Sequence, residues 1–182
     1  MEVLESITQT EIVERCKRGD ASAYTLLYNQ HAKEVYNTIY RLVNHTGEAE
    51  DLLQETFVSA FQAIGRFEHT GGFRAWVKRI AINKSLSWLR KKKVRMVELE
   101  PVNMRDNADE PVDEQAFAFK VEEVKKAIES LSDAHRLIIQ LHIFENITHV
   151  EIGEMLGLSN NNVRIQYHRA KQKVLQALKQ EA

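Results

Sequence analysis

Cysteine and proline are scarce in this chain of 182 residues, which contains one cysteine and two prolines. With Cys16 as its single cysteine, the chain cannot form an internal disulfide. A zinc site at Cys16 is not expected either, because no second cysteine or close histidine accompanies it. Long apolar runs are also missing, since no stretch approaches the roughly 20 residues that a membrane span needs. The first residues lack the basic-then-apolar pattern of a signal peptide, so we expect a cytoplasmic protein with no membrane insertion.

The chain also lacks a strong net charge, since its formal charge is −1. Charged residues make up 28% of the sequence and hydrophobic residues 43%. This composition is typical of folded globular domains rather than of disordered chains. Strand-like alternation is missing too, and apolar residues recur with a helical period over most of the chain. The length allows one moderate core or two small ones.

The near-neutral total charge hides blocks of like charge along the chain. Residues 74–95 contain nine bases and no acid, and residues 164–179 contain five bases and no acid. Between them, residues 95–115 contain seven acids and two bases, a net charge of −5. Both prolines, Pro101 and Pro111, fall in this acidic segment, which has no apolar period. We therefore predict an extended acidic linker between two helical domains.

The predicted fold class is all-α, with one small helical domain at residues 1–95, the acidic linker at 96–116 and a second helical domain at 117–182. In the first domain, apolar positions at steps of three to four residues predict three amphipathic helices. Asp20 is expected to cap the first of them, and the second follows Gly47.

The third helix of the first domain is expected at about residues 73–93. In the second domain, a helix at about 117–131 should precede Ser132, whose hydroxyl suits the cap of the next helix. Two shorter helices should then complete that domain.

The most specific motif is residues 148–174, THVEIGEMLGLSNNNVRIQYHRAKQKV, which has the spacing of a helix-turn-helix. Gly157 is expected at the turn, and Ser159 at the cap of the second helix. The outward or flanking faces of that helix carry Asn160, Asn161, Arg164, Gln166 and His168, and amide and guanidinium groups suit base edges in the major groove. The bases that suit phosphates are Arg169, Lys171 and Lys173. A plain helical hairpin with a solvated basic face is the alternative.

A second candidate site is the basic helix FRAWVKRIAINKSLSWLRKKK. Trp76, Ile80 and Asn83 share one helical face, with bases on an adjoining face. Aromatic rings stack on unpaired bases while cations follow the phosphates, so this combination suits single-stranded DNA. The alternative is that Trp76 and Trp88 belong to the core.

The third candidate is an acidic strip in GEAEDLLQETFVSAF, where Glu48, Asp51 and Glu55 share one helical face with no base on the same helix to compensate them. Such a strip repels phosphate, so it should face either solvent or a basic protein partner. From the residues alone, a solvated face is the simpler interpretation.

Three ordered motifs, EAEDLLQETFVSAF, FRAWVKRIAIN and the helix-turn-helix behind an acidic linker, resemble the extracytoplasmic-function (ECF) group of sigma-70-type sigma factors. The resemblance covers about residues 20–94 and 121–178. It implies a factor for transcription initiation that joins the bacterial RNA polymerase core, binds promoter DNA as duplex and as melted non-template strand, and is controlled by an anti-sigma factor. It implies no cofactor, no catalytic residue and no metal site.

The resemblance also implies roles for particular residues. The polymerase-docking motif of the family matches Asp51, Leu52, Gln54 and Glu55, which favours a protein partner over a solvated face. The minus-ten promoter element would be opened and read by Phe67, Arg74, Trp76, Lys78, Arg79, Asn83, Lys84 and Arg90. The minus-thirty-five element would be read by Asn160, Asn161, Asn162, Arg164, Gln166, His168, Arg169, Lys171 and Lys173.

Three departures separate this chain from its apparent family. Ser87 stands where the family often has Asp, Gly153 stands where Ala is usual, and the recognition helix lacks the common Thr-Val-Lys-Ser-Arg core. The promoter sequence therefore cannot be transferred from relatives. Other functional classes are a stand-alone helix-turn-helix regulator that does not bind polymerase and a protein-binding helical adaptor. An enzyme is not expected, because phosphate-binding glycine loops, nucleophile elbows and His-Glu-x-x-His pairs are missing from the sequence.

Overall fold

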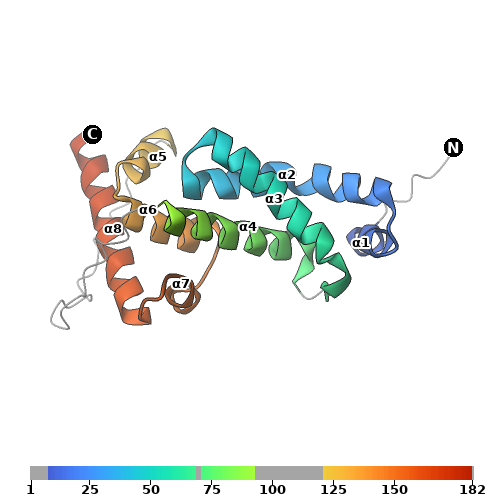
Figure 1. Ribbon diagram of the computed structural model, residues 1–182. Coiled ribbons are helices and arrows are strands. Elements are labelled where there is room, and N and C mark those ends of the chain that lie inside the picture. The colour runs from blue at the N-terminus through green and yellow to red at the C-terminus, as the bar shows by residue number, and fades with distance from the viewer. Residues whose placement is uncertain (1–7, 69–70, 93–120, 182) are drawn as a thin grey trace. The chain divides into compact units, whose positions relative to one another are not determined.

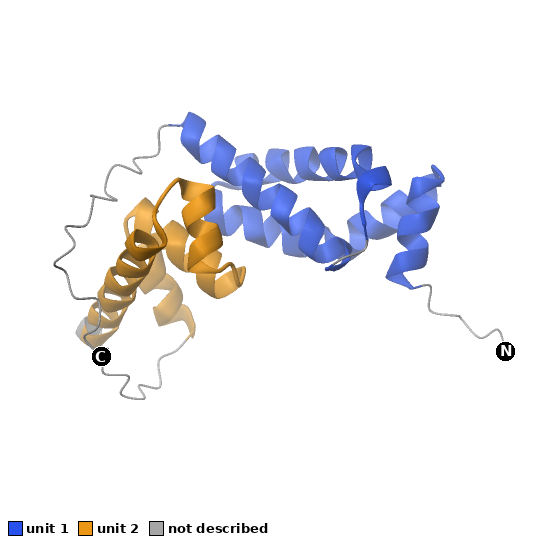
Figure 2. Ribbon diagram, turned by 90° about the horizontal axis from the view of Figure 1, so that it is seen from below, with its two compact units in different colours: residues 1–92 blue, residues 93–182 orange. Residues whose placement is uncertain are grey.

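The computed structural model describes residues 8–68, 71–92 and 121–181 of the chain. Within these residues the structure is helical and contains no strand, which confirms the predicted all-α class. The chain divides into two compact units, residues 1–92 and 93–182 (Figure 2). The predicted linker at 96–116 lies outside the described residues. None of the described helices is long and apolar enough to span a membrane.

The first unit is built on three long helices that pack side by side (Figure 1). Its elements are α1 (Gln9–Lys17), α2 (Ala21–Val43), α3 (Thr46–Gln62), the 3-10 segment η1 (Ile64–Arg66) and α4 (Gly72–Lys91). Helices α2, α3 and α4 are the three that the sequence predicts, and α1, which packs on α2, is an addition. Cys16 is buried on the inner face of α1, together with Ile12 and Val13.

Local signals set the ends of these helices. Asp20 caps α2 as predicted, because its Oδ1 accepts a hydrogen bond from the Ser22 backbone N–H at 2.9 Å. Gly71 and Gly72 precede and begin α4 with φ angles of +85° and +77°, a backbone region that favours glycine. The paired glycines therefore form the start of the basic helix.

The core of the first unit lies where α2, α3 and α4 meet. Leu27 and Ile39 of α2, Phe57 of α3, and Phe73 and Val77 of α4 are buried there. Burial of one such side chain stabilises a fold by about 1.5–3 kcal/mol. This core therefore fixes which faces of α3 and α4 remain available for binding.

The second unit is organised around its last helix. Its elements are α5 (Val121–Glu129), α6 (Asp133–Ile139), the π-helical segment η3 (Gln140–Phe144), α7 (His149–Leu156) and α8 (Asn160–Glu181). Helices α5, α6 and α7 all pack on α8. Of the two shorter closing helices that the sequence predicts, α7 is short, with 8 residues, but the prediction is wrong for α8, which has 22. Its length lets one apolar stripe serve α5 at one end and α7 at the other.

The region before α6 departs from the prediction in one detail. Ser132 precedes the helix as expected, but its hydroxyl makes no capping bond to the backbone. It lies instead 3.0 Å from Nδ1 of His135, a buried imidazole of α6. The start of the helix predicted at about 117–131 falls partly outside the described residues, and α5 begins at Val121.

Candidate nucleic-acid interface

Helices α7 and α8 form the predicted helix-turn-helix. Thr148 and Glu151 close a capping box at the start of α7. Gly157 ends that helix with φ +71° and donates its N–H to the Gly153 carbonyl. Ser159 then accepts a hydrogen bond from the Asn162 N–H at 3.2 Å, which confirms its predicted role as the cap of α8.

The glycine inside α7 has a packing reason. A Cβ atom on Gly153 would lie 2.6 Å from the Leu158 carbonyl oxygen, closer than real Cβ contacts. The Leu158 N–H also donates to the Gly153 carbonyl at 2.8 Å. Gly153 thus allows the turn to fold tightly against α7 in this chain, which offsets its lower helix propensity of about 1 kcal/mol relative to alanine.

The first turns of α8 present the predicted base-reading groups. Asn160, Asn161 and Arg164 are exposed. No carboxylate among the described residues pairs with Arg164. Amide and guanidinium groups at the start of a helix can reach furthest into a DNA groove. This end of α8 is therefore available for a ligand.

The other predicted residues of α8 differ in exposure. Asn162, His168, Arg169 and Lys171 are half-buried, and Lys173 is exposed. The Lys173 Nζ lies 3.5 Å from Nδ1 of His135. The cationic groups of Arg169, Lys171 and Lys173 follow Arg164 along the helix, where contacts to phosphate are geometrically simpler than contacts to bases.

Gln166 requires a correction. Its side chain is 1% exposed, and its Oε1 lies 3.0 Å from Nε2 of His135 in the interior of the unit. An interior amide cannot reach a base edge, so the prediction that Gln166 reads DNA is wrong. The His135–Gln166 pair joins α6 to α8 through a buried polar contact, which the sequence analysis missed.

Three rings pack together on the inner side of the recognition helix α8, one of them from α8 itself. His142 lies 4.2 Å from His149 between ring centroids, and Tyr167 of α8 lies 4.8 Å and 5.1 Å from them. The His142 Nδ1 donates to the Ile147 carbonyl at 2.9 Å. Burial lowers the pKa of His149 below its ordinary value, and nearby His142 and Arg164 lower it further.

In the first unit, the acidic strip of α3 faces the basic helix α4. Glu48 accepts hydrogen bonds from Trp88 Nε1 at 2.7 Å and from Lys92 Nζ at 3.0 Å, and Lys92 lies 4.6 Å from the centroid of the Trp88 ring. Lys92, and then Trp88, lower the pKa of Glu48. Lys84 of α4 and Lys92, which directly follows that helix, therefore compensate part of this strip, although no base on α3 does.

The predicted docking residues are not all exposed. Asp51, Gln54 and Glu55 lie on the surface, but Leu52 is only 5% exposed. The backbone carbonyl of Leu52 accepts a hydrogen bond from the buried Thr56 hydroxyl at 2.6 Å. The prediction that Leu52 contacts polymerase with the rest of the docking motif is therefore not supported, because most of its side chain packs inside the unit.

Two of the predicted minus-ten residues are held by an acid from α2. Arg74 forms a two-pronged contact with Glu34, with Nε to Oε2 at 2.7 Å and Nη2 to Oε1 at 2.5 Å. Lys78 lies 3.4 Å from the same carboxylate. Arg74 first, with Lys78, holds the pKa of Glu34 below its usual range. The sequence did not predict Glu34 as part of this site, because 40 residues separate it from Arg74.

The predicted aromatic contacts also need correction. Phe67 is 5% exposed, and its ring lies 5.0 Å from Trp76 and 6.0 Å from Phe73. A ring enclosed by two others has no free face for a base, so the direct DNA role predicted for Phe67 is not supported. Trp76 is half-buried, so part of its surface remains exposed.

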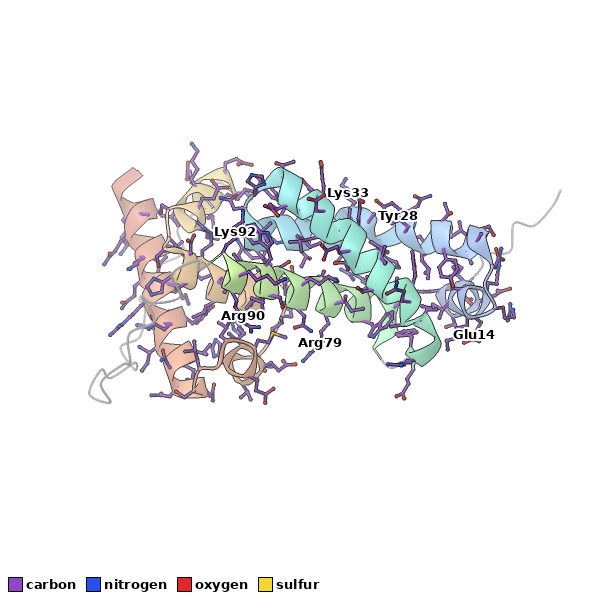
Figure 3. All side chains as sticks on the ribbon, in the orientation of Figure 1. Glu14, Tyr28, Lys33, Arg79, Arg90 and Lys92 are labelled. Carbon is purple, nitrogen blue, oxygen red and sulfur yellow. The ribbon has the colours of Figure 1, made fainter. Side chains whose placement is uncertain are left out.

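Arg79, Asn83 and Arg90 are exposed on α4. Figure 3 shows Arg79 and Arg90 on the same side of the helix, with Lys92 on the other side near its C-terminal end. The basic helix thus has one side turned towards the carboxylates of its own unit and another that presents cations outward. In the part of the chain that is described, no three His, Cys, Asp or Glu residues gather to hold a metal ion.

Together, the two units define a class of all-helical proteins with a C-terminal helix-turn-helix. Residues 27–95 match the family model described as Sigma-70 region 2, and residues 127–176 match Sigma-70, region 4. The chain belongs to the sigma-70 family of RNA polymerase sigma factors, and several of its relatives are named ECF sigma factors.

Two relatives and one solved structure illustrate this placement. The chain is 33% identical over 162 residues to the ECF RNA polymerase sigma factor SigE of Mycolicibacterium smegmatis, covering 86% of this chain and 63% of that protein. It is 27% identical over 177 residues to ECF sigma factor SigW of Bacillus subtilis, covering 92% and 95%. The sigma factor RpoE of Bartonella quintana, solved with the anti-sigma factor NepR, has a TM-score of 0.55 at 21% identity, covering 87% and 98%, and shows the same fold.

Proposed function

We propose that this chain directs promoter-specific transcription initiation as an ECF-type sigma factor in the cytoplasm, bound to the RNA polymerase core. The observation that carries the proposal is the order of two sigma-70 regions on one chain, the second ending in a helix-turn-helix with exposed Asn160, Asn161 and Arg164. The factor itself performs no covalent chemistry. It selects DNA for an enzyme that does.

The second unit would recognise the upstream promoter element as duplex. Arg164 and the two exposed amides would contact base edges in the major groove. Arg169, Lys171 and Lys173 would contact phosphates and set the position of the helix without reading sequence. Gln166 would act indirectly, by holding α8 against His135.

The first unit would bind both polymerase and the opened downstream element. Asp51, Gln54 and Glu55 form an exposed acidic and amide surface suited to a basic protein partner. The melted non-template strand would be followed by Trp76, Arg79, Asn83, Lys84 and Arg90, where cations meet phosphates and partly exposed rings meet bases. An anti-sigma factor would control the chain by covering these surfaces, as a partner of the kind bound by the Bartonella quintana protein.

A mobility-shift experiment with and without core polymerase tests this proposal against a stand-alone regulator. DNA fragments selected by the reconstituted holoenzyme should shift strongly when core is present and weakly with the free protein. Tight binding by the free protein, unchanged by core, would instead identify a regulator that acts alone. No DNA dependence under either condition would identify a protein-binding adaptor.

A further inference from the structure

A groove of about 470 Å³ runs between α3 and α4 in the first unit. Leu52 and Glu55 line it from α3, and Asn83, Lys84 and Trp88 line it from α4. Glu55 belongs to the surface proposed for polymerase, and Asn83 and Lys84 belong to the surface proposed for DNA. The groove therefore brings together side chains that are expected to serve different partners.

Glu55 and Lys84 form an ion pair across this groove, with Glu55 Oε2 at 3.4 Å from Lys84 Nζ. The Glu55 side chain is 64% exposed and that of Lys84 is 27% exposed. Water screens such a pair, and exposed pairs of this length are weak. The contact can therefore be broken by a partner that offers a better counterion to either residue.

A second contact between the same helices provides a contrast. Glu48 holds both the Trp88 indole at 2.7 Å and the Lys92 ammonium at 3.0 Å, while Lys92 also lies over the Trp88 ring. Three mutually supporting contacts fix the helix ends together. The single contact of Glu55 does not have this support, so the pair can separate while α3 and α4 stay in place.

We propose that Glu55 and Lys84 form an exchangeable ion pair, which lowers the affinity of the free protein for DNA and opens when polymerase binds Glu55. The proposal rests on the proposed function, in which Glu55 docks on polymerase and Lys84 contacts the melted strand. A basic polymerase surface would replace Lys84 as the counterion of Glu55. Lys84 would then be released to a phosphate, and Glu55 acts as a positioning residue for Lys84.

A double-mutant cycle on the full-length free protein tests this coupling. Binding of a fluorescein-labelled oligodeoxythymidylate is measured by anisotropy for the wild type, Glu55→Gln, Lys84→Gln and the double variant. Glu55→Gln should tighten binding by about two- to fivefold, as expected for release of an exposed pair. The double variant should lose that gain, because no ammonium remains to be released.

Glu50→Gln is the matched control. Glu50 is exposed on the same helix and has no ion pair among the described residues, so the substitution removes the same charge without releasing Lys84. Its effect on binding should be smaller and the same with or without Lys84. If Glu55→Gln binds no better than Glu50→Gln, or keeps its gain when Lys84 is replaced, the proposal is overturned. Circular dichroism of each variant checks that all are folded.

A holoenzyme measurement tests the opening step. Lys84→Gln should reduce the slope of log affinity against log salt by about one for holoenzyme on promoter DNA, and by less for the free protein. Equal reductions in both states would show that polymerase does not open the pair. Core affinity, measured separately for Glu55→Gln and Glu50→Gln, identifies a different failure: if the two are equal, the docking role of Glu55 is wrong even when the free-protein coupling holds.

Discussion

The basic residues of the two units have different neighbours. In the first unit, Arg74, Lys78, Lys84 and Lys92 of the α4 region each lie against a carboxylate from α2 or α3. In the second unit, Arg164 stands exposed on a helix that has no acid from residue 160 to 180. The bases of a like-charged block can therefore be compensated by acids from neighbouring helices, as in the first unit, or stand exposed with no carboxylate partner among the described residues, as Arg164 does.

This difference suggests a division of labour. DNA binding by the second unit requires only that the recognition helix meets a groove. DNA binding by the first unit competes with internal ion pairs, whose carboxylates must be screened or taken by another partner. The following predictions sharpen this comparison or break it.

The largest effect is expected at Gln166, which separates the inner face of α8 from its outer face. Gln166→Ala removes the contact of the amide with Nε2 of His135 and creates a cavity, so the second unit should lose about 2–3 kcal/mol of unfolding free energy. Hydrogen exchange followed by mass spectrometry measures this loss in the full chain. Gln176→Ala, exposed on the same helix, is the control. Native stability with altered promoter preference would show that Gln166 faces DNA after all.

Arg164→Ala tests the open surface of the second unit. Removal of a guanidinium that contacts a base edge should cost about 1–3 kcal/mol at the preferred upstream element and flatten the preference among its variants. Lys173→Ala should weaken binding to all variants alike, because an ammonium on phosphate carries no sequence information. Binding of holoenzyme to a panel of upstream variants distinguishes them. A change of preference in Lys173→Ala, with uniform weakening in Arg164→Ala, would reverse the assigned docking direction.

Gly153→Ala concerns the turn that orients α8. The new Cβ would meet the Leu158 carbonyl oxygen at 2.6 Å, so the strain should exceed the gain in helix propensity and leave a net loss of about 1–2 kcal/mol in the second unit. Gly65→Ala is the matched control in the first unit, where a Cβ meets nothing within 4 Å. The two tryptophans, Trp76 and Trp88, report unfolding of the first unit separately. Equal effects of the two substitutions would disprove the clash.

The smallest effect is expected on acidification. Burial lowers the pKa of His149 from an ordinary value of 6.5, so the unfolded chain binds this proton more readily than the folded one. The stability that neutral His149 contributes is therefore present above pH 6.5 and is lost as the pH falls through its folded pKa. His149→Gln should make the second unit less sensitive to pH between 7 and 5. A steeper pH dependence in the variant than in the wild type would contradict this sign.

Local sequence signals predicted much of the fold. Asp20, Gly157 and Ser159 act at the helix ends where their chemistry suggested, because capping depends on residues only a few positions apart. Helix α1 was missed, since a helix of nine residues gives too few turns for its apolar period to show.

Part of the candidate site could not be read locally. The pairs Glu34–Arg74 and Glu55–Lys84 join residues 40 and 29 positions apart, so their contacts depend on how the helices pack. The burial of Gln166 did have a local signal, because it lies at helical spacing from the buried Val163, Ala170 and Val174. The polar character of its amide outweighed that position in the sequence analysis.

Run-off transcription with reconstituted holoenzyme tests the central claim, that this chain selects promoters for RNA polymerase, most directly. Purified core is combined with the wild-type chain, with an Asp51→Ala, Gln54→Ala and Glu55→Ala triple variant, or with no added protein, on a pool of DNA fragments whose transcripts are sequenced. We expect defined start sites only with the wild type, and weaker transcription with the triple variant that recovers as its concentration is raised. Start sites unchanged by adding the chain, or full activity of the triple variant at limiting concentration, would contradict the account.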